Sequence, residues 1–166
     1  MLGNIKTRDN VIRREFRLKE GEVFDGSKLK RSKQRINNLN YFEDVKIDTQ
    51  RGDNPDLIDI LTTVTEKPTG SFTVGAGFSS IENLIFTTSI AQDNLFGNGH
   101  RVNLTASLSS IRSDFNISLT EPRLFDSEIS AGIDAFNQAQ DYLSFDAKTT
   151  GAGFRLGKNI TEFESL

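Results

Sequence analysis

The sequence contains no cysteine and only one histidine in 166 residues. The absence of cysteine excludes a disulfide framework and any cysteine-ligated metal site. The single histidine, His100, follows Gly-Asn-Gly in a segment that we predict to be a turn, and no second histidine is present to share a metal or a proton. The Gly-Ala-Gly segment at 75–77 lacks the lysine and the helix of a phosphate-binding loop. We therefore expect no enzymatic activity, no metal and no cofactor.

Long apolar runs are missing as well. No stretch approaches the roughly 20 residues that a membrane-spanning helix needs, and the polar start of the chain, MLGNIKTRDN, is not a secretory signal peptide. Charge is unevenly spread, because residues 1–68 hold 14 basic and 12 acidic side chains whereas residues 69–166 hold 6 and 11. This contrast predicts two domains in different solvents, 1–68 and 69–166. The net charge of -3 is too small to indicate binding to nucleic acid.

The second half alternates apolar and polar side chains almost without a break. Because successive side chains of a strand point to opposite faces, this period of two predicts strands that are wet on one side. Segments of about ten such residues between turns are typical of a transmembrane β-barrel wall. We predict six antiparallel strands, at roughly 69–79, 84–93, 101–110, 113–121, 128–138 and 143–156. The predicted lipid-facing residues are Val102, Leu104, Ala106, Leu108, Phe115, Ile117 and Leu119, with Phe72, Val74, Ala76, Phe78, Ile129, Ala131 and Ile133 on the same face.

Two features of this barrel wall remain open in the sequence. In the second strand Ile85 and Phe86 are adjacent, and in the sixth strand Phe145 competes with Phe154 and Leu156 for the apolar face. Six strands are also too few to close a bacterial barrel, which needs at least eight. Two strand edges are therefore left open, and through them the fragment can associate with itself.

The first half indicates a small α+β domain. Thr7 is the expected N-cap of a helix over residues 8–17, and Ser27 that of a second helix from Lys28 to Leu39. Two strands follow, YFEDVKID and LIDILTTVTEK, and a truncated first strand at residues 2–4 completes a βααββ order. The basic side chains of the second helix favour a solvated face over nucleic-acid binding, since no aromatic residues are interleaved with them. Such a face is also weakly attracted to anionic lipid headgroups.

Five segments in this order carry a resemblance to a known family. They are GNIKT from Gly3, RREFRLKEG from Arg13, RINNLNYFEDV from Arg35, EKPTGSFTVGAGFSS from Glu66 and DNLFGNGH from Asp93. Together they resemble the BamA family of outer-membrane β-barrel assembly factors. Residues 1–68 resemble its membrane-proximal POTRA domain, with the first strand truncated, and the rest resembles the first strands of its barrel. Asn40 replaces the expected glycine but can still adopt a left-handed conformation, and the later barrel strands are absent, so we expect a piece of a longer protein.

The resemblance implies a function and two sites. It implies a central assembly factor in the outer membrane of a Gram-negative bacterium, with the POTRA domain in the periplasm and outer-membrane lipid around the barrel. Its partners would be lipoprotein subunits of the same machine and unfolded outer-membrane protein clients, whose strands it templates into the membrane. Docking of the lipoprotein is expected at Arg13, Glu20, Arg14 and Arg17. The gate strand, which offers its edge to a client, is expected at Thr69, Gly70, Ser71, Phe72, Thr73, Val74, Gly75, Ala76, Gly77 and Phe78.

Other interpretations stay open at this point. The charged residues between Arg13 and Glu20 also fit an ordinary solvated helix face, and the glycines of the gate strand also fit a bend in an ordinary wall strand. A translocation pore, of the two-partner-secretion or organelle-import type, shares the POTRA-plus-barrel plan. A soluble β-rich interaction domain, whose alternating strands face a protein core, is the alternative outside this superfamily.

Overall fold

The computed structural model describes residues 1–158 except 53 and 55, and the chain forms two compact units. The first unit comprises Met1–Thr69 together with Phe96–Asn98, and the second comprises Gly70–Leu95 with the residues from Gly99 onward. Residues 159–166, the last of the predicted barrel part, lie outside the described residues.

The first unit consists of α1 (Asp9–Arg13), α2 (Gly26–Asn38), β1 (Phe42–Arg51) and β2 (Ile58–Glu66). β1 and β2 pair antiparallel. On the other edge of β2, Leu2 forms a single parallel bridge with Thr63, in which the Leu2 N–H donates to Thr62 O and the Val64 N–H donates to Leu2 O, both at 2.9 Å. The predicted βααββ order with a truncated first strand is thus confirmed.

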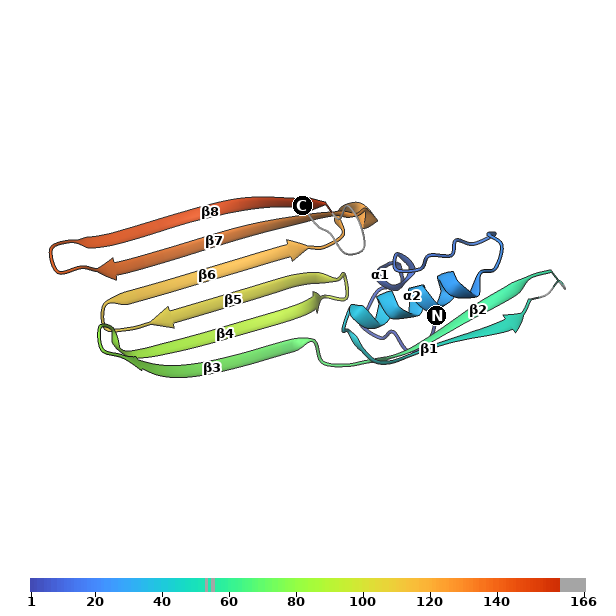
Figure 1. Cartoon of the computed structure of the whole chain (residues 1–166), viewed down its shortest axis with the longest axis horizontal. Helices are drawn as coiled ribbons and strands as arrows, with labels where there is room; N and C mark the ends of the chain where they lie inside the picture. The colour runs from blue at the N-terminus through green and yellow to red at the C-terminus, as the bar shows by residue number, and fades with distance from the viewer. Residues whose placement is uncertain (53, 55, 159–166) are drawn as a thin grey trace. The chain divides into compact units, whose positions relative to one another are not determined.

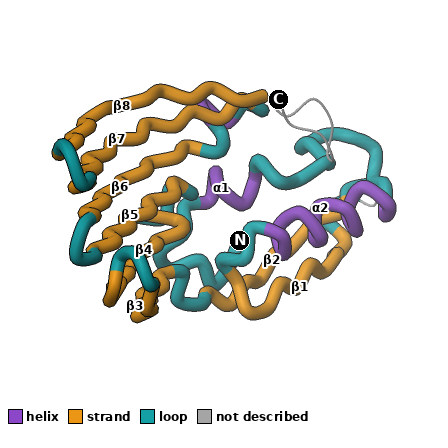
Figure 2. Tube along the Cα trace, turned by 60° about the vertical axis from the view of Figure 1, so that its left-hand side comes forward, coloured by secondary structure: helices purple, strands orange, loops and turns teal. Residues whose placement is uncertain are grey.

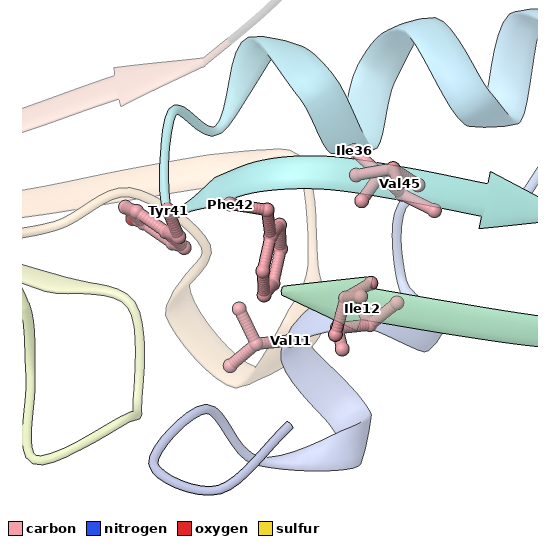
Figure 3. Close-up of a cluster of buried hydrophobic side chains, with 7 residues drawn as sticks. Val11, Ile12, Ile36, Tyr41, Phe42 and Val45 are labelled. Atoms are coloured by element: carbon pink, nitrogen blue, oxygen red, sulfur yellow. The ribbon is translucent and has the colours of Figure 1, made fainter. Parts of the chain in front are cut away.

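The core of this unit is formed by apolar residues at helical and strand spacing. α1 contributes Val11 and Ile12, α2 contributes Ile36, and β1 contributes Phe42 and Val45 (Figure 3). Tyr41 and Val64 complete the cluster, and Phe16, Leu39 and Ile47 pack against it. Burying a side chain of this size stabilises the fold by about 1.5–3 kcal/mol, so this cluster helps to hold both helices against the strands.

Both predicted N-caps are wrong. α1 begins at Asp9, after an Arg8 that makes no side-chain cap, and it ends at Arg13 instead of residue 17. Thr7 is instead buried, and its backbone N–H donates to Glu66 Oε1 at 2.6 Å. α2 is capped by Asp25, whose carboxylate accepts from the N–H groups of Ser27 and Lys28. The Asp25 carboxylate, two residues before the predicted cap Ser27, accepts hydrogen bonds from two N–H groups of the first turn. The helix therefore begins earlier than predicted.

The second unit is a six-stranded antiparallel sheet with the strand order β3-β4-β5-β6-β7-β8. The strands are β3 (Gly70–Ser79), β4 (Asn83–Leu95), β5 (His100–Leu108), β6 (Arg112–Glu121), β7 (Ile129–Asp141) and β8 (Asp146–Lys158), with a short 3-10 turn at Leu124–Asp126. The strands lie side by side in chain order (Figure 1) and form a single curved layer (Figure 2). β3 and β8 each have one neighbour, so within the described residues the sheet is not closed, as expected.

The register shows which side chains share a face. Leu104 lies opposite Ile90 on one side and Ile117 on the other, and the same alternation continues across all six strands. We call this side the apolar face: Phe72, Val74, Ala76, Phe78, Leu84, Phe86, Ile90, Val102, Leu104, Ala106, Leu108, Phe115, Ile117, Leu119, Ile129, Ala131, Ile133, Phe154 and Leu156. The register also resolves both ambiguous strands, because Phe86 and not Ile85 lies on this face, and because Phe145 precedes β8 and stacks on Tyr142.

One prediction in this half is wrong. His100 is the first residue of β5 rather than part of a turn, and its Nε2 atom pairs with the carboxylate of Glu121 at the end of β6. The turn ends one residue earlier, since Gly97 and Gly99 adopt the positive φ angles that the tight reversal requires. Among the described residues, no helix is long and apolar enough to cross a membrane.

Candidate docking surface and edge strand

The predicted docking residues Arg13 and Glu20 meet at the surface of the first unit. Arg13 is the last residue of α1, Glu20 lies in the loop before α2, and Arg13 Nη1 donates to Glu20 Oε1 at 2.7 Å. The two side chains are 59% and 89% exposed. An ion pair this exposed contributes about 0–1 kcal/mol to stability, so exchanging it for contacts with a partner costs little.

The other two predicted docking residues occupy different environments. Arg17 is exposed, and its backbone N–H donates to Ser32 Oγ at 2.8 Å, which ties the loop to α2. The Arg14 side chain is only 7% exposed and lies 4.0 Å from Glu15 Oε1. Glu15 also accepts from Arg35 Nε at 2.9 Å and pairs with Arg35 Nη2 at 2.8 Å. Arg14 therefore belongs to an internal charge cluster, whereas Arg13, Arg17 and Glu20 face solvent.

Glu22 fixes the conformation of the loop between the two helices. The Lys19 N–H and the Lys28 ammonium, which donate hydrogen bonds to its carboxylate, lower the pKa of Glu22 below its ordinary value. The side chain is therefore anionic at neutral pH and holds the loop to the first turn of α2.

Beside this loop lies a groove of about 1220 Å³ that the sequence did not reveal. Its walls are the segment from Arg13 to Phe24, the segment from Asp56 to Thr62, and Met1. Val23 is 90% exposed there, and Phe24 and Leu57 are exposed as well. These apolar residues sit in loops, where no periodicity marks them. The adjacent Val-Phe pair in an otherwise polar loop is the one signal that points to them.

The predicted gate strand forms one edge of the sheet. β3 pairs with β4 over Gly70–Ser79, and Thr69 immediately precedes it. Among the described residues nothing pairs with its other side, so its outward N–H and C=O groups form an open edge. Phe78, 78% exposed, projects from the apolar face. On the opposite face a Cβ built at Gly75 or Gly77 would meet no atom within 4 Å, so this part of the edge is bare backbone.

Near the opposite edge of the sheet, large side chains cover two glycines. A Cβ on Gly151 of β8 would lie 2.6 Å from the ring of Phe136 on β7. Arg155 of β8 lies across Gly132 in the same way and reaches Asp134, with Nη2–Oδ1 at 2.9 Å. Phe136 of β7 thus covers Gly151 of β8, and Arg155 of β8 covers Gly132 of β7, whereas a Cβ built on Gly153 would meet no atom within 4 Å. Sequence reasoning missed this arrangement, because it depends on register.

All seven predicted lipid-facing residues lie on the apolar face, by register. For metal binding, the described part of the chain contains no group of three or more His, Asp or Glu side chains that could hold an ion.

Two family models match separate parts of the chain. Residues 1–67 match the family model of the POTRA domain, described as a surface antigen variable number repeat, and residues 94–166 match the Omp85 superfamily domain. The outer membrane protein assembly factor BamA of Neisseria meningitidis is 36% identical over 99% of this chain and 22% of its own length. BamA of Nitratidesulfovibrio vulgaris is 35% identical over 99% of the chain and 21% of its own. The chain thus spans about a fifth of the length of these relatives.

Solved structures give the same result. The crystal structure of BamA from Haemophilus ducreyi lacking POTRA domains 1–3 matches with a TM-score of 0.86 and 30% identity, over 98% of this chain and 32% of that one. CdiB from Acinetobacter baumannii matches with a TM-score of 0.61 and 12% identity, over 97% and 34%, which shows the shared fold alone.

Fold and matches together define the class: a POTRA domain joined to N-terminal strands of an Omp85-type barrel. The chain belongs to the BamA family of outer membrane protein assembly factors. We assign it accordingly to the outer membrane of a Gram-negative bacterium, with the POTRA domain in the periplasm.

Proposed function

We propose that this chain carries two working surfaces of an outer-membrane protein assembly factor. Its POTRA domain binds a partner lipoprotein through Arg13, Glu20 and Arg17, with Arg14 holding the adjoining segment in place. Its edge strand β3 pairs with strands of unfolded client proteins and templates their entry into the membrane. The seven predicted lipid-facing residues, together with the rest of the apolar face, contact outer-membrane lipid. The activity is binding, without a change in covalent bonds.

The observation that carries this proposal is the open edge of β3. Backbone N–H and C=O groups pair with an incoming strand whatever its side chains are, so an exposed edge accepts clients of many sequences. Gly75 and Gly77 leave one face of the edge without side chains, so a client strand meets no steric barrier there. Inside a bilayer every backbone polar group must be paired, which makes pairing with a client strongly favourable.

Site-specific cross-linking tests the templating step. Because the chain contains no cysteine, Thr73→Cys on β3 introduces a single thiol at the edge. Thr105→Cys on β5 is a matched control, since Thr73 and Thr105 both lie opposite Ser89 on one face, but Thr105 has a strand on each side. We expect disulfides between Thr73→Cys and a client strand with one cysteine, and none from Thr105→Cys. Equal yields at both positions contradict templating at this edge.

A charge exchange tests the docking surface. The double variant Arg13→Glu with Glu20→Arg keeps the internal ion pair but reverses the charges offered to a partner. We expect unchanged stability together with loss of lipoprotein co-purification from native membranes. If the double variant still binds while each single variant does not, the pair acts within the POTRA domain and is not a docking contact.

Depleting the parent protein separates this function from a translocation pore. Loss of an assembly factor removes other β-barrel proteins from the outer membrane, whereas loss of a pore removes only its exported substrate. A soluble interaction domain is disfavoured by the exposure of the apolar face, since Phe72, Phe78 and Phe154 are not covered by any described segment. Monomeric behaviour of the parent without detergent, with this face protected, would restore that alternative.

A further inference from the structure

The β7–β8 pair is built largely from small residues, which are Ala131, Gly132, Ala135, Ala139, Ala147, Gly151, Ala152, Gly153 and Gly157. Glycine-rich strands specify their register weakly, because few side chains interlock across the pair. The alternation of apolar and polar residues excludes a shift of one residue, which would turn β8 to the other face. The same alternation permits a shift of two residues, because the side-chain period of a strand is two.

One such shift would preserve the packing between the two strands. The ring of Phe136 covers Gly151 in the observed register and would cover Gly153 after β8 had moved by two residues. Gly153 has room for it, since a Cβ built there would meet no atom within 4 Å. On the apolar face Ile133 would then lie opposite Leu156, so that face would stay apolar. We call this alternative the slipped register.

The charges and the turn of the hairpin favour different registers. Asp141 lies opposite Asp146 in the observed register, and like charges directly opposite each other are destabilising. The slipped register would instead bring Lys148 opposite Asp141. Against this, the rings of Tyr142 and Phe145 stack with their centroids 4.7 Å apart and close the observed turn. The hairpin by itself therefore gives no strong preference for one register.

Arg155 of β8 makes contacts that only the observed register allows. It lies opposite Gly132, and a Cβ built on that glycine would lie 3.2 Å from Arg155 Nη2, so the guanidinium passes over the glycine. Beyond it, Nη2 donates to Ser118 Oγ on β6 at 2.9 Å and, at 3.5 Å, to Thr120 Oγ1. The guanidinium also binds the Asp134 carboxylate, with Nε–Oδ2 at 2.6 Å. In the slipped register Arg155 would lie opposite Asp134 and keep this ion pair, but the Asp134 side chain would stand between Arg155 and β6.

We propose that Arg155, by reaching across Gly132 to β6, locks β8 in the observed register. The contact joins three neighbouring strands, β6, β7 and β8 (Figure 1). A slip of two residues would move β8 by about 7 Å along β7. In a closed barrel the stagger of the strands fixes the diameter, so such a slip would be passed on to every strand paired beyond β8. The lock operates within the sheet and does not require the proposed pairing with clients.

Disulfide formation between paired thiols reports the register, because the chain contains no cysteine of its own. Ala152→Cys is combined with Ala135→Cys, which lies opposite it in the observed register, or with Asn137→Cys, which would lie opposite it only in the slipped register. Opposite residues have Cβ atoms about 5 Å apart and diagonal residues about 7–8 Å, so the opposite pair is the one that forms a disulfide. For the full chain folded in detergent micelles, we expect the observed-register disulfide and little of the slipped one.

Two changes remove the bonds to β6. Arg155→Gln removes the guanidinium, whereas the double variant Ser118→Ala, Thr120→Val removes the acceptors and leaves every charge in place. In each we expect the ratio of slipped to observed disulfide to rise about tenfold, as for the loss of two hydrogen bonds of ordinary net strength. The double variant Thr105→Val, Ser107→Ala is the matched control, since it makes the same substitutions on the same face of β5, and its ratio should not change.

The remaining outcomes decide against the lock. If the ratio stays unchanged in both test variants, the register is set by other contacts. A slip in Arg155→Gln alone assigns the register to the ion pair with Asp134 and overturns the role of the bonds to β6. A slip of equal size in the β5 control also overturns the proposal. Circular dichroism checks that each variant keeps its β-structure, and if Arg155→Gln does not fold, the Ser118→Ala, Thr120→Val variant decides by itself.

Discussion

Replacing Glu66 tests how the end of β2 holds the N-terminal segment of the POTRA domain. Its carboxylate accepts from the Thr7 N–H at 2.6 Å and from the Lys6 N–H at 2.9 Å. Glu66→Gln keeps one carbonyl oxygen, so one of these two donors loses its acceptor. Thr7 is buried and cannot turn to water, whereas Lys6 is exposed. We expect Glu66→Gln to cost about 1–2 kcal/mol and Glu66→Ala about 2–3 kcal/mol of unfolding free energy.

The same site predicts how the loss depends on pH. Burial acts to raise the pKa of Glu66, but hydrogen bonds from the Thr7 hydroxyl and from the N–H groups of Thr7, Lys6 and Ile5 outweigh it and lower the pKa below 4.5. A carboxyl whose pKa is lower in the folded state stabilises the fold above its unfolded pKa, and this contribution disappears as pH falls through the folded value. The difference between the native chain and Glu66→Gln should therefore be constant near neutral pH and shrink below about pH 4.5.

The measurement uses the tyrosines. Tyr41 is buried in the POTRA core and Tyr142 lies in the β7–β8 turn, and the chain has no tryptophan. In a Tyr142→Phe background, tyrosine fluorescence during urea unfolding reports the POTRA domain alone. A loss that is equally large in acid, or no loss at neutral pH, would refute the assignment of these hydrogen bonds.

Three further predictions follow from single contacts. Glu15→Gln leaves the partly buried Arg35 without its counter-charge and should cost about 2–4 kcal/mol of unfolding free energy, while the double variant with Arg35→Gln should recover part of it in a double-mutant cycle. Asn40→Ala forces a residue with a Cβ and no local hydrogen-bonding group into a left-handed turn, at φ 61°, and should cost about 1 kcal/mol in the same urea titration. Gly151→Val displaces the Phe136 ring and should speed amide hydrogen exchange in the β7–β8 hairpin, whereas Gly75→Val should leave exchange there unchanged.

Much of the fold follows from local patterns in the sequence. Apolar and polar residues alternate over residues 101–120. Two strands, each with one apolar face, place all the apolar side chains on one side, because successive side chains of a strand point to opposite faces. The two predicted helices also carry Val11, Ile12 and Ile36, which are apolar and which the structure buries in the core. Asn40 stands where the resemblance led us to expect a glycine, and it adopts the left-handed conformation that asparagine can reach, with φ 61°.

Helix caps and side-chain partners could not be predicted from local sequence patterns in the same way. Thr7 has the right chemistry for an N-cap, but Glu66, distant in sequence, accepts hydrogen bonds from its hydroxyl as well as from its N–H. Asp25 and Ser27 are both good caps, and only the three-dimensional path of the loop selects Asp25. Local propensities differ by a few tenths of a kcal/mol between such candidates, whereas a single tertiary hydrogen bond to a carboxylate contributes about 1.5–3 kcal/mol.

The sequence by itself determined that two kinds of domain follow one another and which side of each barrel strand is apolar, because periodicity and charge are local properties of the chain. Only the tertiary structure decided that Arg13 meets Glu20 while Arg14 turns inward, and that Gly75 and Gly77 of β3 stay bare while Gly151 is covered by Phe136. Those outcomes depend on loop paths and on strand register. Register is set by the whole sheet at once, since a slip of one residue would turn every side chain of a strand to the other face.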